Sequence, residues 1–214
     1  MSRIGIKICG LSTPETIDAA LRGGASHLGL NFFPKSPRYV TPQRLAMLAP
    51  MVPASVKRVA ILVDPDDALI DALVAANGLD ALQLHGKETP ARAAELGART
   101  GLDIWKVISV KTAADLAEGP SYAGAADFLL YDAKTPDGAA MPGGMGMRFD
   151  WTLLAGHRAP LPWGLSGGLD PDNIAEAIRA TNAPLVDVSS GVESAPGVKD
   201  VDKIAAFCKA VRDL

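Results

Sequence analysis

Short apolar segments alternate with helix-like segments along the whole of this 214-residue chain, and that alternation predicts an α/β fold. The apolar segments are continuously apolar, which is typical of parallel strands buried on both faces. Eight such strands with right-handed crossovers can close on themselves, so the sequence predicts a single (β/α)₈ barrel of the TIM type over residues 1–214. An open doubly wound sheet is less favoured, because its first turn usually reads GxGxxG, whereas here it reads CGLSTPE.

The expected strands fall at residues 4–9, 27–32, 59–63, 81–85, 104–109, 128–132, 162–166 and 185–190. The clearest helix-like segments between them are 13–24, 65–78 and 170–182. The first helix has a clear start signal, because Ser12 or Thr13 can cap it and Pro14 suits its first turn. Gly23 and Gly78 stand where helices should end. The connections 32–42 and 133–151 are long and rich in Gly or Pro, which is typical of functional loops.

The amino-acid composition limits which kinds of partner the protein can bind and which cellular compartment it suits. The chain is 48% apolar and 21% charged, with a formal net charge of −3, so no excess of Lys and Arg exists to face nucleic acid or a membrane surface. No apolar run has the length of a membrane span, and the N-terminus lacks a signal-peptide pattern. Two distant cysteines without a CxxC pair favour a reducing, cytoplasmic setting. The three histidines lack ligand spacing, so no metal is expected.

The C-terminal ends of the strands are where a barrel of this kind carries its active site. The residues expected at those ends are Cys9, Asn31, Asp64, His85, Ser109, Asp132, Ser166 and Ser189. Cys9 and Asp132 stand on non-adjacent strands and form a candidate base and acid. A cysteine that closes an apolar run is more often a small buried hydrophobe, but at a strand end beside a helix N-terminus it can be held as a thiolate. Cys208, on one helical face with Ile204 and Phe207, is expected to be inert core.

Two Gly-rich turns, LSGGLDPDN after the seventh strand and SSGVE after the eighth, predict a phosphate site. Backbone N–H groups in such turns hold a phosphate without Lys or Arg, and the last two loops are where barrels most often bind one. The candidate residues in these turns are Gly168, Ser190 and Gly191. Arg38, in the proline-stiffened loop KSPRYVTP, is either a solvated surface arginine or a two-pronged partner for a carboxylate.

Several motifs in one order make the chain resemble a known family. From Lys7 to Glu193 the motifs read, in order, KICG, SPRYV, QLHG, LLYD, GGMGMRFDW, LSGGL and DVSSGVE. Together they resemble phosphoribosylanthranilate isomerase of tryptophan biosynthesis. The resemblance implies a (β/α)₈ barrel, no cofactor and a phosphorylated sugar–anthranilate substrate. The implied reaction is the Amadori rearrangement of N-(5-phosphoribosyl)anthranilate to 1-(2-carboxyphenylamino)-1-deoxyribulose 5-phosphate by acid–base catalysis.

The resemblance also implies roles for individual residues. Cys9 matches the family's general base and Asp132 its general acid, while Arg38 matches the arginine that meets the anthranilate carboxylate. Gly168, Ser190 and Gly191 fall in the phosphate turns, and His85 and Asp187 match polar substrate-binding positions at the rim. The family commonly reads GGTGKxFDW after the sixth strand, whereas Met145 and Met147 replace that threonine and lysine here.

Other functions stay open at this point. Another phosphosugar barrel is one alternative, although an epimerase would want metal-binding His and Asp at strand ends, and indole-glycerol-phosphate synthase would use a lysine and a glutamate. A non-catalytic ligand-binding or redox-responsive barrel would not need both Cys9 and Asp132. A bifunctional sugar-phosphate isomerase would want a second phosphate turn, but the third strand is followed by acidic DPDDALID. The sequence does not decide between a monomer and a homo-oligomer.

Overall fold

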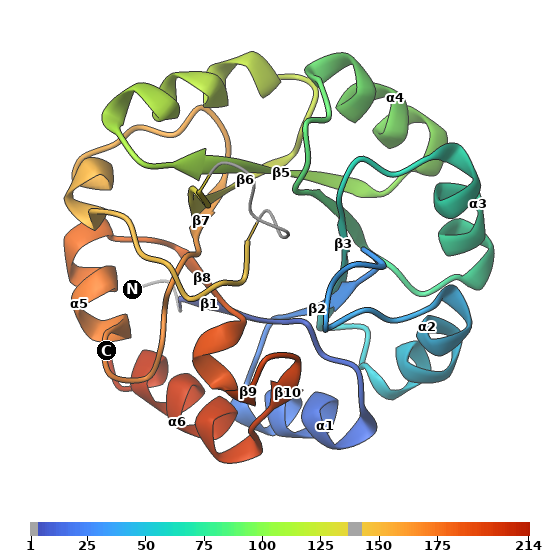
Figure 1. The fold of residues 1–214 in the computed structure, drawn as a ribbon, viewed down its shortest axis with the longest axis horizontal. Helices are drawn as coiled ribbons and strands as arrows, with labels where there is room; N and C mark the ends of the chain where they lie inside the picture. The colour runs from blue at the N-terminus through green and yellow to red at the C-terminus, as the bar shows by residue number, and fades with distance from the viewer. Residues whose placement is uncertain (1–3, 137–142) are drawn as a thin grey trace.

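The computed structural model describes residues 4–136 and 143–214, and its strands β1 to β8 close into a parallel barrel in chain order (Figure 1). The barrel strands are β1 (Gly5–Cys9), β2 (His27–Asn31), β3 (Lys57–Leu62), β4 (Ala81–Leu84), β5 (Asp103–Val110), β6 (Phe128–Ala133), β7 (Trp163–Leu165) and β8 (Leu185–Val188). The barrel closes between β1 and β8, where Lys7 pairs with Asp187 in register. The predicted fold class is confirmed.

Helices form a ring outside the barrel (Figure 1). The α-helices are α1 (Pro14–Gly23), α2 (Pro42–Leu48), α3 (Asp67–Ala76), α4 (Pro90–Thr100), α5 (Ile174–Thr181) and α6 (Val201–Arg212). The 3-10 helices are η1 (Ala49–Met51), η2 (Ala113–Tyr122), η3 (Trp151–Leu154) and η4 (Ser190–Val192). A short hairpin of β9 (Glu193–Ala195) and β10 (Val198–Lys199) follows β8. The three predicted helices are all present, and the helical segments after β5 and β6 are 3-10 rather than α.

The ends of α1 show how the sequence fixes local structure. The Thr13 side chain accepts a hydrogen bond from the Thr16 N–H, and Pro14 occupies the first turn, as the start signal predicts. Gly23 is the last helical residue, while Gly24 takes the left-handed conformation (φ 83°) that ends the helix. At the end of α3 the turn is shared by Asn77 and Gly78, which both have positive φ.

Strand alternation divides the buried residues into two sets. Residues such as Ile6 and Ile8 pack outward against the helices, in the larger core cluster. A smaller cluster fills the barrel interior, and its members are Val59, Ala81, Trp105, Val107, Leu130 and Leu185. Nearer the C-terminal ends of the strands, the buried interior residues become polar, which places the chemistry at that end of the barrel. Within the described residues, no helix is both long and apolar enough to cross a membrane.

Candidate active site

A pocket opens at the C-terminal ends of the barrel strands, where barrel enzymes carry their sites. The pocket and its open mouth together hold about 730 Å³ of space, part of it open to solvent. Of the predicted strand-end residues, those that line it are Cys9, Asn31, His85, Asp132, Ser166 and Ser189. Arg38, Asp187, Gly168 and Ser190 line it too, whereas Asp64, Ser109 and Gly191 do not.

Cys9 ends β1 on the inner face of the barrel and is only 9% exposed. Burial raises the pKa of its thiol, because a thiolate loses its hydration there. The charge of Lys7 lowers this pKa and that of Asp187 raises it, but burial has the largest effect. The expectation of a thiolate held by its surroundings is therefore wrong for the protein alone: the thiol is the favoured form near neutral pH.

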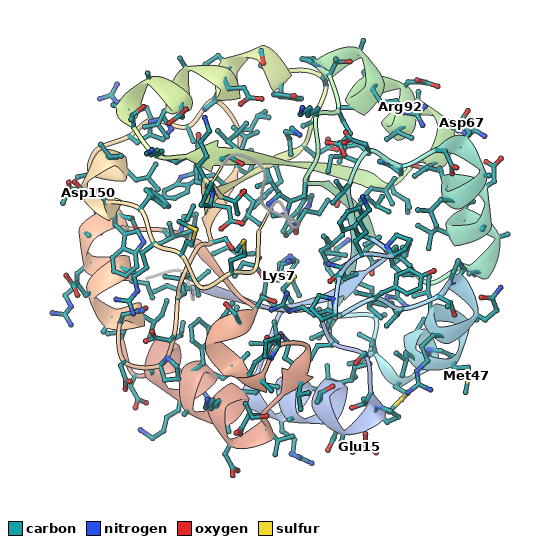
Figure 2. All side chains as sticks on the ribbon, viewed as in Figure 1. Lys7, Glu15, Met47, Asp67, Arg92 and Asp150 are labelled. Carbon is teal, nitrogen blue, oxygen red and sulfur yellow. The ribbon has the colours of Figure 1, made fainter. Side chains whose placement is uncertain are left out.

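Lys7 lies beneath Cys9, two residues earlier on the same inner face of β1. Figure 2 shows it inside the ring of strands, whereas the other labelled residues lie toward the outside. Its Nζ donates to Asp187 Oδ1 at 2.9 Å, and the two side chains are 0% and 4% exposed. Burial opposes the charge of Lys7, but Asp187 and Cys9 outweigh it and raise the pKa of Lys7.

Sequence reasoning missed Lys7 as a site residue, although a signal was present. In GIKIC, Gly5, Lys7 and Cys9 alternate with the outward-facing isoleucines, so the strand period places Lys7 and Cys9 on one face. A lysine inside a closed barrel needs a counter-charge. Asp187 supplies it, and Ser166 Oγ lies 3.3 Å from the other Asp187 carboxylate oxygen.

Asp132 faces the same pocket from β6, with its two carboxyl oxygens in different surroundings. Oδ1 accepts the Ala133 N–H at 2.8 Å, whereas Oδ2 lies 3.3 Å from Nε2 of His85, without the geometry of a hydrogen bond. The loop after β6 covers this pair through Gly143, where a Cβ would lie 2.8 Å from Asp132 Oδ2 and 2.5 Å from a ring carbon of His85. A glycine at that position lets the backbone approach both side chains.

The two Gly-rich turns pack tightly against each other. A Cβ at Gly191 would lie 1.9 Å from the Leu169 carbonyl oxygen, so this glycine joins the turns although it does not line the pocket. Basic side chains from elsewhere also reach both turns, which sequence reasoning did not foresee. Arg148 Nε donates to the Gly168 carbonyl at 3.1 Å, and Lys199 Nζ donates to the Ser189 carbonyl at 2.9 Å.

Arg38 is buried rather than solvated, with 6% of its surface exposed. Its Nε and Nη2 donate to the two carboxylate oxygens of Glu193 at 2.7 and 2.8 Å, and Nη2 also donates to the Gly144 carbonyl at 3.0 Å. Glu193 was not foreseen, because the two residues stand 155 positions apart and no local pattern connects them. Arg38 still lines the pocket.

Met145 and Met147, the two residues that depart from the family pattern, line the pocket and are 52% and 37% exposed. They belong to the long connection after β6. Residues 137–142 of that connection lie outside the described residues.

A closed parallel barrel with a thiol, a carboxyl group and Gly-rich turns around one pocket is the architecture of a (β/α)₈-barrel enzyme. Comparison with known proteins makes the class specific. The family model described as N-(5'-phosphoribosyl)anthranilate (PRA) isomerase matches residues 6–210. The N-(5'-phosphoribosyl)anthranilate isomerase of Paramagnetospirillum magneticum is 52% identical over 209 residues, covering 98% of this chain and 97% of the relative. That of Zymomonas mobilis subsp. mobilis is 54% identical over 207 residues, covering 96% and 97%.

Solved structures agree with these sequence matches. The phosphoribosyl anthranilate isomerase of Thermotoga maritima superposes with a TM-score of 0.87 at 33% identity and covers 100% of both chains. A phosphoribosyl anthranilate isomerase in complex with reduced 1-(o-carboxyphenylamino)-1-deoxyribulose 5-phosphate superposes with a TM-score of 0.85 at 32% identity, again over 100% of both chains. This chain therefore belongs to the N-(5'-phosphoribosyl)anthranilate isomerase family, whose enzymes serve tryptophan biosynthesis. The family and enzyme class predicted from sequence are confirmed.

Proposed function

We propose that this chain converts N-(5-phosphoribosyl)anthranilate to 1-(2-carboxyphenylamino)-1-deoxyribulose 5-phosphate, with Asp132 as general acid and Cys9 as general base. The observation that carries the assignment is that both groups line one pocket from non-adjacent strands. General acid–base pairs of this kind contribute about 10²–10⁴-fold each to a rate.

Asp132 acts first, by protonating the ring oxygen of the closed ribose. The bond between that oxygen and C1′ breaks, and the nitrogen lone pair forms a C1′=N iminium. The geometry of Asp132 suits this step, because the Ala133 N–H holds Oδ1 and Oδ2 is left to carry the proton. Its position at 5% exposure excludes most competing water.

Cys9 then removes the C2′ proton. The electrons of that C–H bond move toward the iminium nitrogen and give an enolamine, which tautomerises to the ketone. Burial disfavours the thiolate in the protein alone, but the iminium brings a positive charge to the pocket when the base is needed. An opposite charge within about 4–6 Å favours ionisation. Lys7 acts in the same direction from below.

Two other parts of the pocket suit the two ends of the substrate. The Arg38 guanidinium can hold the anthranilate carboxylate, while the turns at Gly168, Ser190 and Gly191 offer backbone N–H groups to the phosphate. His85 and Asp187 also line the pocket, where their side chains can serve as further polar contacts to the substrate. The ligand named for the solved relative carries both a carboxyl group and a phosphate, which supports a substrate with two anionic ends. Two free cysteines are consistent with the cytoplasm as the working compartment.

The direct test is to follow the fluorescence of phosphoribosylanthranilate after addition of the purified protein. We expect decay that is proportional to the enzyme concentration and is lost in Asp132→Asn, whose amide cannot donate an acidic proton. Rescue of a tryptophan auxotroph that lacks the isomerase is the biological check. No decay above the spontaneous rate, with folded protein and fresh substrate, would contradict the proposal.

A further inference from the structure

Glu193 and Lys199 form a buried charged cluster with Arg38 at one side of the pocket. Glu193 Oε1 accepts from two cations at once, Arg38 Nε at 2.7 Å and Lys199 Nζ at 2.7 Å. The three side chains are only 1% to 6% exposed, so they are shielded from water. Burial opposes the ionisation of Glu193, but the Arg38 hydrogen bonds and the Lys199 charge outweigh it and lower the pKa of the carboxyl group.

The cluster links segments that are far apart in the chain. Glu193 and Lys199 pair across the β9–β10 hairpin, and the Gly197 N–H donates to Glu193 Oε2 at 3.3 Å. Lys199 Nζ also donates to the carbonyl and hydroxyl oxygens of Ser189 at 2.9 and 3.3 Å. All three ammonium protons of Lys199 therefore have acceptors, although burial lowers the pKa of this lysine against the opposing effect of the Glu193 charge.

The charges of the cluster do not balance among the described residues. Two cations share one carboxylate, and Asp187, another buried acid of the pocket, is already paired with Lys7. A buried charge is costly unless it is paired. Among the described residues, Nη1 of Arg38 makes no hydrogen bond, since Glu193 and Gly144 take only Nε and Nη2.

From this geometry we infer that Glu193 and Lys199 are positioning residues that hold Arg38 in place for an anionic group of the substrate, the anthranilate carboxylate. The inference rests on the proposed function and deepens it. Glu193 fixes one edge of the Arg38 guanidinium and leaves the Nη1 donors for the ligand. Lys199 adds a second positive charge to the cluster, and the substrate carboxylate neutralises the charge that Glu193 alone leaves unbalanced. Lys199 also ties this arrangement to the turn after β8 through Ser189.

The test uses two ligands that differ only in the group concerned. One is reduced 1-(o-carboxyphenylamino)-1-deoxyribulose 5-phosphate, and the other is the same molecule without the carboxylate. Titration calorimetry on Glu193→Gln should show about tenfold weaker binding of the first ligand and less than about twofold weaker binding of the second. The matched control is Glu176→Gln, because Glu176 is exposed on α5, and it should change neither Kd.

Kinetics separate positioning from chemistry. Glu193→Gln should raise KM about tenfold and change kcat less than about threefold, because Cys9 and Asp132 stay in place. The Arg38→Lys, Glu193→Gln double variant should be no worse than Arg38→Lys alone, since Glu193 acts through Arg38. Lys199→Met should likewise weaken binding of the carboxylated ligand more than binding of the ligand without the carboxylate.

Several results would overturn the inference. Equal losses of affinity for both ligands would overturn it, as would additive effects in the double variant or a Glu193→Gln variant that behaves like Glu176→Gln. If the wild type still turns over the substrate, these results leave the proposed function intact. Absence of wild-type turnover would instead count against the proposed function. If Glu193→Gln does not fold, Glu193→Asp keeps the charge at a shorter reach. Glu193→Asp should then also weaken binding of the carboxylated ligand more than binding of the other ligand, and an equal loss of affinity for both ligands would refute the inference.

Discussion

Replacing Lys7 by methionine breaks a buried ion pair inside the barrel. Lys7 Nζ and Asp187 Oδ1 are 2.9 Å apart, and both side chains are almost wholly excluded from solvent. Methionine fills a similar space, so the main loss is the counter-charge of Asp187, which among the described residues then keeps only the hydrogen bond from Ser166 Oγ at 3.3 Å. Breaking such a pair by removing one partner costs about 3–5 kcal/mol of unfolding free energy.

Urea unfolding followed by circular dichroism near neutral pH measures this loss. The Lys7→Met, Asp187→Asn double variant should recover a large part of it, because no buried charge is then left alone. Lys57→Met is the matched control, since Lys57 is an exposed residue at the start of β3. It should stay within about 0.5 kcal/mol of wild type. A loss below about 1 kcal/mol for Lys7→Met would refute the reasoning.

The same substitution should change the pH dependence of catalysis. Lys7 lowers the pKa of the Cys9 thiol against the effect of burial, so Lys7→Met should raise that pKa further. Because the base must be ionised, the acidic limb of the kcat/KM profile should move to higher pH. A limb that stays in place, or moves to lower pH, would mean that it does not report Cys9.

Further substitutions test the pocket and the core. Arg38→Lys should raise KM, and it should weaken binding of the carboxylated ligand more than binding of the ligand without the carboxylate, because a point charge cannot reproduce a two-pronged contact. Equal losses of affinity for both ligands would mean that Arg38 only stabilises its loop. Gly168→Ala places a Cβ 2.7 Å from the Met147 carbonyl oxygen, so KM should rise at least about tenfold. Gly124→Ala, also at positive φ but with open space around it, should leave KM unchanged. Cys208→Ala should keep full activity, and because burial raises the pKa of this thiol to about 11, a thiol reagent should not modify it in the folded protein at pH 7.

The strand ends were predictable from sequence because parallel buried strands leave a continuous apolar signal. Once the barrel is assigned, its topology places the last residue of each strand at one rim, which is why Cys9 and Asp132 could be placed in one pocket. Cys208 was predictable for a similar reason, since helical spacing alone puts it in the core, where it is 0% exposed.

Long-range side-chain pairing was not predictable in the same way. Nothing local to Arg38 indicates that Glu193 would neutralise it, since the contact depends on how the β9–β10 hairpin folds back on the rim. The ionisation of the Cys9 thiol was also misjudged, because the sequence shows that Cys9 ends a strand but not how deeply the barrel buries its side chain. The crossover after β5 is 3-10 rather than α, and Pro120 inside it lacks the N–H that an α-helix would use.

The measurement that tests the central claim most directly is kcat/KM of Cys9→Ser on phosphoribosylanthranilate, with folding checked by circular dichroism. Serine keeps the size and position of the side chain, but its hydroxyl stays protonated near neutral pH and cannot act as the base. We predict a loss of about 10²–10⁴-fold in a barrel that is still folded. Activity within about tenfold of wild type would contradict the assignment of Cys9 as the general base.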